Sequence, residues 1–497
     1  METRIRLFKD FLGEKGFELF IVISLTLAVF FAADFLLMPK LVDSIPIGLG
    51  SLWMMAALIL SLAINLRYGL LPGLYLIMAA ISFDKIDFVA GLRLTEVFFA
   101  GFFGVWLIRS FREKKLLLSF NRLSLPIGLF IIANFASLLA TDDLLISTKR
   151  IAILIYLVFL FHVFVHLVKE KRDFLRSLFF FIYPTILLSL YSVTQFFNVG
   201  YWQIVQEVAG KTNWWLGVIP RVTGLYRDPN FLAMNIVVVF ALLLAFYLSG
   251  IFKRWSLFFL IGLIPLVISL YLTASRSNWV AAVFVFVVAV GFGLKLLNLK
   301  KIFIISAIII FSVMLVSTAV PLYTQFINDQ EVSQGKIDPR ANKILKKRAE
   351  TIIEFKTETG GDRINAYKAA VLMAKDHPLF GVGVDRFAVN YDKYILKEET
   401  KYQSVTAHNI FLETLAEKGI FGLFALLWIT VAVFMYLIKG YFSVKEPLDK
   451  VLFSAVFVSL IGFFTSTLLL TGLYELFFWF ILGFAAILFK LHRIQIK

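Results

Sequence analysis

Four basic side chains in the second half of the sequence could perform acid–base or anion-binding chemistry. His408 stands in TAHNIFLETLAEKGIFG, where a polar segment gives way to an apolar run of membrane length. A histidine with a pKa near 6.5 can accept the proton of a hydroxyl group at neutral pH. Arg221 and Arg227 flank a Thr-Gly turn, and Arg276 occupies the short polar turn of YLTASRSNWV. Because guanidinium groups bind phosphates through forked hydrogen bonds, the sequence predicts a general base beside an anionic ligand.

Simpler interpretations exist for these side chains. His408 could be an interfacial histidine at the tip of an amphipathic segment. Arg276 and Arg227 could reach the phosphates of ordinary phospholipids. An arginine near the hydrocarbon boundary is costly, however, and normally has an anionic partner. The turn around Arg276 offers little solvated loop to hold a charge, which favours a bound anionic headgroup.

We expect the site to work without a metal ion or cofactor. The chain has five histidines and no cysteine, which excludes disulfides, thiolate metal sites and cysteine nucleophiles. The other histidines are dispersed, without ligand spacing, at positions 162, 166, 377 and 492. Asp142-Asp143 could hold a divalent ion, but a solvated loop tip is the preferred interpretation, and His377 before Pro378 is interpreted as a cap or turn residue.

The segments that position these residues must be membrane helices. The 497-residue chain is 60% hydrophobic and contains 55 Phe. Its mean hydropathy is +0.86, far above that of a soluble domain. We therefore predict an all-α polytopic membrane protein with about fourteen (12–14) spans. The predicted spans lie near 17–38, 45–64, 69–83, 94–109, 125–140, 151–168, 176–198, 229–250, 255–273, 278–294, 302–320, 419–438, 451–470 and 473–490.

Charge distribution predicts the orientation of these spans. Every second loop is rich in Lys and Arg, as in FREKK, KEKRD, FKRW, KLLNLKK, KGYFSVKEPLDK and KLHRIQIK. The positive-inside rule places these loops and both termini in the cytoplasm, with the basic segment METRIRLFKDFLGEKGF as an uncleaved lead-in. The net charge of +16 is then mainly an orientation signal and a match to anionic membrane lipid, so no nucleic-acid partner is expected.

The motif around His408 resembles that of a known family. The motif consists of His408-Asn409, nine further residues and Gly419-Ile420-Phe421-Gly422. It is similar to the histidine motif of the bacterial O-antigen ligase and O-antigen polymerase superfamily. RVTGL, residues 221–225, is similar to its arginine-x3-leucine motif. The stretches GLYRDPNFLA, TASRS and HPLFGVGVDRF also resemble the family, so that the resemblance covers roughly residues 200–440.

This resemblance implies a multi-span, lipid-donor glycosyltransferase acting on the periplasmic face of the bacterial inner membrane. Such enzymes transfer a glycan from undecaprenyl pyrophosphate to an acceptor hydroxyl. For a ligase the acceptor is lipid A–core, and for a polymerase it is a lipid-linked repeat unit. The ligase is the preferred interpretation. His408 is expected to be the general base. Arg221, Arg276 and Arg227 are expected to bind the donor pyrophosphate.

Four neighbours of His408 are expected to support it. Asn409 would orient the histidine or cap the following helix, and Glu413 on the same face could hold an acceptor sugar. Gly419 and Gly422 would let the helix bend or pack closely where it enters the membrane.

The predicted organisation has four parts. Residues 1–198 form an N-terminal transmembrane bundle, 199–320 a transmembrane region with arginine-bearing periplasmic loops, 321–408 a large periplasmic helical loop, and 409–497 the C-terminal transmembrane helices. In the large loop, apolar spacing predicts helices over Pro339–Phe355, over RINAYKAAVLMAK with Asp362 as its cap, and after HPLFGVGVDRF. This loop should lie as a partial lid over a cavity where Arg221, Arg276 and His408 converge.

A transporter, such as a flippase for the same lipid-linked glycan, is the competing class. It would require charged residues along a cavity at the membrane midplane and two halves with matched broken helices. The sequence lacks that pattern, because the notable basic groups are all predicted on one face.

Overall fold

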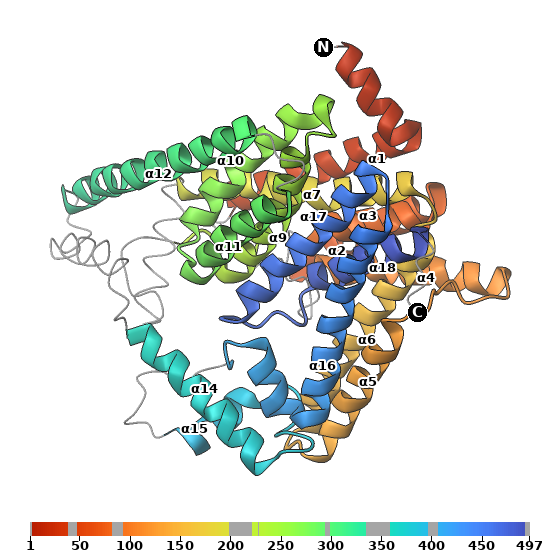
Figure 1. Cartoon of the computed structure of the whole chain (residues 1–497), viewed down its shortest axis with the longest axis vertical. Coiled ribbons are helices and arrows are strands. Elements are labelled where there is room, and N and C mark those ends of the chain that lie inside the picture. Colours follow the sequence, from red (N-terminus) through yellow and green to blue (C-terminus); the bar gives the residue numbers. More distant parts are fainter. Residues whose placement is uncertain are drawn as a thin grey trace.

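The computed structural model describes residues 2–37, 47–81, 93–197, 221–226, 228–293, 299–333, 358–395 and 406–492. The regular elements in these ranges are helical (Figure 1). The α-helices are α1 (Glu2–Leu37), α2 (Ile47–Arg67), α3 (Leu70–Ala80), α4 (Leu94–Arg112), α5 (Ser124–Ala136), α6 (Leu144–Leu167), α7 (Lys171–Phe196), α9 (Pro229–Ser249), α10 (Ser256–Leu272), α11 (Arg276–Gly293), α12 (Leu299–Ser333), α14 (Glu358–Asp376), α15 (Phe387–Tyr394), α16 (Ile410–Ser443), α17 (Pro447–Thr467) and α18 (Leu476–His492).

The helices confirm a multi-pass α-helical membrane protein. Each apolar run predicted from the sequence coincides with one of these helices. Eight helices in the described ranges are long and apolar enough to cross a membrane, and further apolar helices such as α3 and α18 are shorter. The figure of fourteen spans therefore stays a prediction.

Helix α9 is the centre of the bundle. Its residues are almost all buried, and it packs against α7, α10, α11 and α17. Polar side chains join it to its neighbours: Ser459 donates a hydrogen bond to the Val238 carbonyl (3.0 Å), and Asn235 donates one to Thr185 (3.2 Å). Such hydrogen bonds between apolar helices fix their relative register. The first turn of α9, which carries part of the candidate site, is therefore held by rigid surroundings.

Several segments that the charge pattern predicts on one side of the membrane lie close together. At one end of the bundle Lys171 forms ion pairs with Glu446 (2.7 Å) and Asp449 (2.6 Å), and Lys490 donates to the Val165 carbonyl (2.6 Å). These residues belong to segments predicted to share the cytoplasmic side. The segments around positions 142, 385 and 408 meet at another place, described below. Which end faces the cytoplasm stays a prediction.

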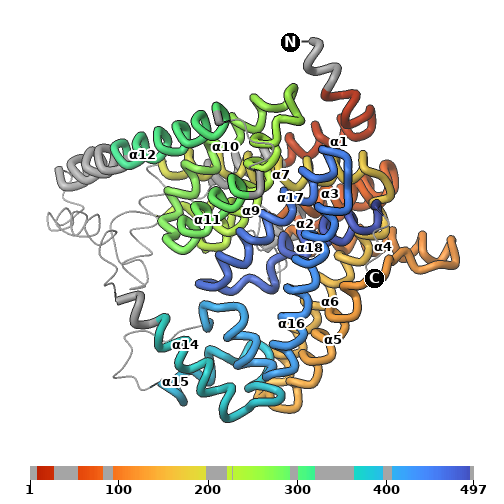
Figure 2. The backbone as a smooth tube through the Cα atoms, in the orientation of Figure 1, coloured from red at the N-terminus to blue at the C-terminus, as the bar shows by residue number. Residues whose placement is uncertain are grey.

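A small helical unit made of α14, α15 and the segment 377–386 lies against the first half of α16 (Figure 2). Its core consists of Ala366, Ala369, Ala370, Met373, Val382, Phe387, Tyr391, Ile395, Ala407 and Ala416. Helices were predicted over RINAYKAAVLMAK and after HPLFGVGVDRF, and both are present. The cap prediction was wrong, because α14 already begins at Glu358 and runs through Gly360-Gly361, so Asp362 lies inside the helix. Glycine weakens a helix without forbidding it. The helix predicted over Pro339–Phe355 lies outside the described residues.

Candidate functional site

His408 sits in a tight turn that is fixed on both sides. Its backbone φ of 49° is in the left-handed region, which non-glycine residues adopt rarely and usually where the surroundings enforce it. Before it, the Ala407 N–H donates to the Glu413 carboxylate (3.1 Å). After it, the Asn409 side chain caps α16 by accepting hydrogen bonds from the N–H groups of Phe411 (2.9 Å) and Leu412 (3.0 Å). These hydrogen bonds therefore fix the backbone that carries the His408 imidazole.

Three further hydrogen bonds connect this turn, α14 and the end of α17. The Tyr367 hydroxyl of α14 donates to the carbonyls of Leu468 (3.3 Å) and His408 (3.5 Å). The Asn409 amide also donates to the Leu468 carbonyl (3.1 Å). Leu468 is the C-cap residue that follows the last residue of α17. The histidine turn, α14 and the end of α17 thus meet at one point.

Arg221 braces the turn that precedes Arg276. Its Nε donates to the Thr273 carbonyl (2.7 Å), and its Nη2 donates to the Asn230 side-chain oxygen (2.9 Å) in the first turn of α9. Ser275 donates to the same Asn230 oxygen (2.8 Å). The arginine-x3-leucine segment is therefore joined to the α10–α11 turn, which immediately precedes Arg276.

Arg276 is the first residue of α11, and its side chain is exposed. It lies near Arg363, an α14 residue that the sequence reasoning missed. Burial, together with the positive charge of Arg276, lowers the pKa of Arg363. Arg363 in turn lies near His408: burial and the charge of Arg363 lower the pKa of that imidazole to about 4. Arg363 thus lies within electrostatic range of both Arg276 and His408.

Arg363 carried a weak signal in the sequence. It precedes Tyr367 by four residues, so both lie on one face of α14. An arginine one turn from a tyrosine on an amphipathic helix is unremarkable. Arg227, the third arginine predicted to bind the donor, lies outside the described residues.

The glycine pair of the motif has a steric explanation. Helix α16 is kinked at Gly419 (φ 63°, ψ −164°), a conformation open essentially to glycine alone. Backbone hydrogen bonds from Val382 to Ala416 (2.9 Å) and from Ile420 to Pro378 (2.9 Å) hold the segment 377–386 across the kink. The kink brings Lys418 close to Gly422. A Cβ added at position 422 would overlap the Cβ of Lys418. Both glycines therefore shape the helix that follows His408.

The carboxylate of Glu413 already has partners within the protein. Its carboxylate accepts the Ala407 N–H and lies near Glu417 and Lys418, which form a buried ion pair (2.9 Å). Glu417 also accepts the N–H of Phe387 at the start of α15 (3.2 Å). This network holds the small helical unit on α16. The use of Glu413 for an acceptor sugar stays a prediction.

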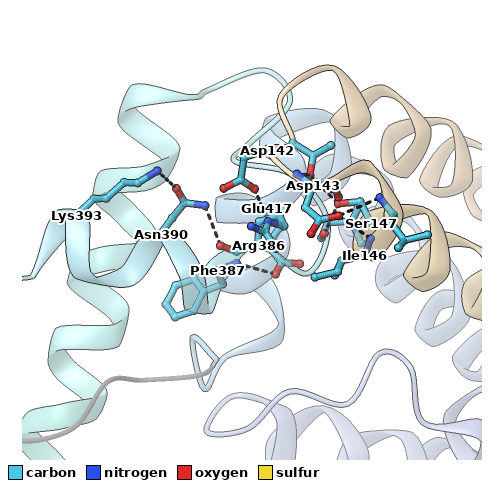
Figure 3. A network of polar contacts seen from close by, with 12 residues as sticks. Asp142, Asp143, Ile146, Ser147, Arg386, Phe387, Asn390, Lys393 and Glu417 are labelled. Carbon is cyan, nitrogen blue, oxygen red and sulfur yellow. Dashed lines mark hydrogen bonds and ion pairs between the residues drawn. The ribbon is translucent and has the colours of Figure 1, made fainter. Parts of the chain in front are cut away.

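Asp142 and Asp143 both have protein partners (Figure 3). Asp142 forms an ion pair with the buried Arg386, which lowers the pKa of the aspartate. Asp143 caps α6, accepting the N–H groups of Leu145 (3.0 Å) and Ile146 (3.1 Å). In the described ranges no three His, Cys, Asp or Glu side chains come together as a metal site would require. The Asp142–Arg386 ion pair joins the short loop before α6 to the segment 377–386.

The arrangement can perform two tasks at once. A neutral imidazole can accept a proton, because its lowered pKa keeps it unprotonated near pH 7. The guanidinium group of Arg363, near His408, can hold an anion through charge-assisted hydrogen bonds. The site therefore fits a reaction in which a hydroxyl loses its proton close to an anionic group.

Comparison with known families agrees with these features. The family model described as O-antigen ligase matches residues 261–427, a range that includes Arg276, Arg363, His408, Gly419 and Gly422. No curated protein sequence matches the chain significantly. The match confirms the resemblance found in the sequence motifs over this range.

Proposed function

We propose that this protein transfers a glycan from an undecaprenyl-pyrophosphate-linked donor to an acceptor hydroxyl, and the match of residues 261–427 to the family model described as O-antigen ligase supports the proposal. The reaction takes place at the periplasmic face of the inner membrane, and the acceptor is lipid A–core. The observation that carries the proposal is the hydrogen-bonded turn that holds His408, whose imidazole is kept neutral by burial and by the nearby positive charge of Arg363.

The chemistry assigns separate roles to these groups. The acceptor oxygen attacks the anomeric carbon and forms the new glycosidic bond, while the bond from that carbon to the pyrophosphate oxygen breaks. His408 accepts the hydroxyl proton as the oxygen attacks, a contribution of about 10²–10⁴-fold in rate. The departing lipid pyrophosphate gains negative charge in the transition state, and nearby guanidinium groups stabilise it. Residues of the chain suffice for each step.

The rigid turn around His408 supports this role. A base must remain within hydrogen-bond reach of the hydroxyl, and the Asn409 cap, the Glu413–Ala407 bond and the Tyr367 contact hold the turn in place. Preorganisation of this kind lowers the cost of bringing acceptor and donor together.

The lipid-linked intermediates of a deletion strain test the assignment. Loss of a ligase leaves polymerised glycan on the undecaprenyl carrier, which is the expected result, and His408→Ala supplied on a plasmid should leave the same species. Single repeat units on the carrier would instead identify a polymerase. Lipid-linked glycan retained on the cytoplasmic face would identify a flippase and contradict the proposal.

A further inference from the structure

The segment between α4 and α5 has no part in the proposed reaction, yet it exposes both apolar and basic side chains. This basic segment, residues 111–122, has the sequence FREKKLLLSFNR. Its strongly exposed apolar side chains are Phe111 (75%), Leu116 (63%) and Phe120 (74%). Its basic side chains, all of them exposed, are Arg112, Lys114, Lys115 and Arg122. Single apolar side chains on a surface need no explanation, but three in one short segment mark a surface that contacts something apolar.

The basic segment is held in a fixed conformation by α4 and α6. Leu117 is buried, and its carbonyl accepts a hydrogen bond from the Trp106 indole (3.2 Å). The Ser119 N–H donates to the His162 carbonyl (3.3 Å), and the Ser119 carbonyl accepts from the His162 Nδ1 (2.9 Å). The Phe120 ring packs against the same imidazole, with 4.9 Å between the ring centroids. The exposed side chains are therefore carried by an ordered backbone.

Lysines from three segments lie around His166, at the end of α6. Lys115 belongs to the basic segment, Lys169 to the corner between α6 and α7, and Lys490 to the end of α18. All three are within electrostatic range of the His166 imidazole. The Lys490 ammonium donates to backbone carbonyls at the end of α6 (2.6 and 2.9 Å). In the ranges that the structure describes, neither Lys115 nor Lys169 is paired with a carboxylate. Positive charge gathered in this way attracts anions.

Helix α6 relates the basic segment to the candidate site. Asp143 caps its beginning, next to the ion pair of Asp142 with Arg386, and His166 lies in its last turn. Its 24 residues extend over about 36 Å, enough to cross the hydrocarbon core of a bilayer, which is about 30 Å thick. Both α4 and α6 are long and apolar enough to span a membrane. The basic segment therefore lies at a membrane surface, opposite to the surface near the segment 377–386.

The composition of the basic segment fits the boundary layer of a bilayer. Aromatic and aliphatic side chains enter the edge of the acyl region, while Lys and Arg side chains reach the phosphate layer. Each basic residue near such a surface raises the preference for anionic lipid by about fivefold. The loops that supply Lys115, Lys169 and Lys490 were all predicted on the cytoplasmic side, where the membrane surface is negatively charged.

We propose that the basic segment is a binding site for anionic phospholipid of the bilayer. Phe111, Leu116 and Phe120 enter the boundary of the acyl region, and Lys115 and Lys169 bind the headgroup phosphate. This inference does not depend on the proposed function, because the site lies at the other end of α6 and takes no part in glycan transfer.

Site-specific fluorescence in nanodiscs tests the proposal. The chain contains no cysteine, so Leu116→Cys can be labelled uniquely with an environment-sensitive fluorophore in the purified full-length protein. The nanodiscs contain equal parts of phosphatidylglycerol and phosphatidylcholine, with quenching bromine atoms on the acyl chains of one lipid or the other. We expect blue-shifted emission, and stronger quenching by brominated phosphatidylglycerol than by brominated phosphatidylcholine. This preference should weaken as the salt concentration rises.

Charge variants of the labelled protein test the assigned lysines. Lys115→Gln together with Lys169→Gln should remove most of the preference for the anionic lipid. Lys115→Arg together with Lys169→Arg should retain it, because the site requires positive charge. The matched control is Lys368→Gln together with Lys375→Gln, which removes two exposed positive charges from α14 and should leave the preference unchanged.

Three results would overturn the proposal. Equal quenching by the two brominated lipids would show that the segment does not select anionic lipid. Emission without a blue shift, and without quenching by either lipid, would show that the segment lies outside the bilayer and would favour a soluble partner. An equal loss of preference in the Lys368 and Lys375 control would show that the net charge of the protein, and not the basic segment, attracts the anionic lipid.

Discussion

Gly419 and the carbonyl of Leu379 are so close that a Cβ on the glycine would overlap it. This contact places the segment 377–386 directly against the kink of α16. The kink follows the part of α16 whose residues Asn409 and Glu413 hold the backbone around His408 in place. The kink is therefore more than a bend at the membrane boundary, because it provides the surface on which the small helical unit docks.

Gly419→Ala should destabilise the protein for this reason. The backbone conformation at Gly419 costs about 1–3 kcal/mol for any other residue, and the overlap with Leu379 adds to it. We expect lower thermal stability and loss of transfer activity, measured by detergent-solubilised melting and glycan transfer. Gly128→Ala in the neighbouring α5 is the control. A Cβ there meets nothing within 4 Å, so this change should be neutral or slightly stabilising. Equal melting temperatures for the two variants would contradict the steric account of the kink.

Asp142→Asn should release the small helical unit from the bundle. The variant leaves the buried Arg386 without its carboxylate, and because Asp142 is half-exposed we expect a loss of about 1–3 kcal/mol, less than for a fully buried pair. Limited proteolysis between α12 and α16 should become faster. Asp143→Asn is a closely matched control, since asparagine caps helices as well as aspartate does. Faster cleavage of both variants would mean that general charge loss, and not the Arg386 pair, is responsible.

The pH dependence of transfer should report on Arg363. Burial and the positive charge of Arg363 lower the pKa of His408 to about 4, and a base is active only when unprotonated. In the free enzyme, activity should therefore be lost as the pH falls through about 4, well below the ordinary histidine value of 6.5. Arg363→Gln removes a positive charge, so the pKa of His408 should rise and the acid limb of kcat/KM should move to higher pH. Lys375→Gln should leave the limb in place. An acid limb that stays fixed or moves to lower pH in Arg363→Gln would show that the two side chains are not coupled.

Donor binding should shift the same limb. A bound pyrophosphate brings negative charge beside His408 and favours the protonated imidazole. The acid limb of kcat, which reports on the enzyme–substrate complex, should therefore lie at higher pH than the limb of kcat/KM. Coincident limbs would place the donor charge far from His408.

The sequence predicted the elements of this site better than their arrangement. Membrane solvation forces apolar runs into helices, so every predicted run coincides with a helix. The spacing of His408, Gly419 and Gly422 led to the family that residues 261–427 match. Arg363 escaped notice because its importance depends on a contact between α14 and a turn 41 residues later, and helical periodicity does not reveal such contacts. The Asp142–Arg386 pair joins positions 244 residues apart, and for the same reason the sequence favoured a solvated loop tip at Asp142.

The central claim, that His408 is the base that activates the acceptor, is tested most directly by donor binding and glycan transfer measured together in His408→Asn. Asparagine tolerates the left-handed conformation of position 408 better than alanine does, so the turn should persist, but it cannot accept the hydroxyl proton. The account predicts that transfer falls by about 10²–10⁴-fold while the affinity for farnesyl pyrophosphate changes by less than about twofold. A His408→Asn protein that retains most of its turnover would contradict the account and return His408 to the role of an interfacial histidine.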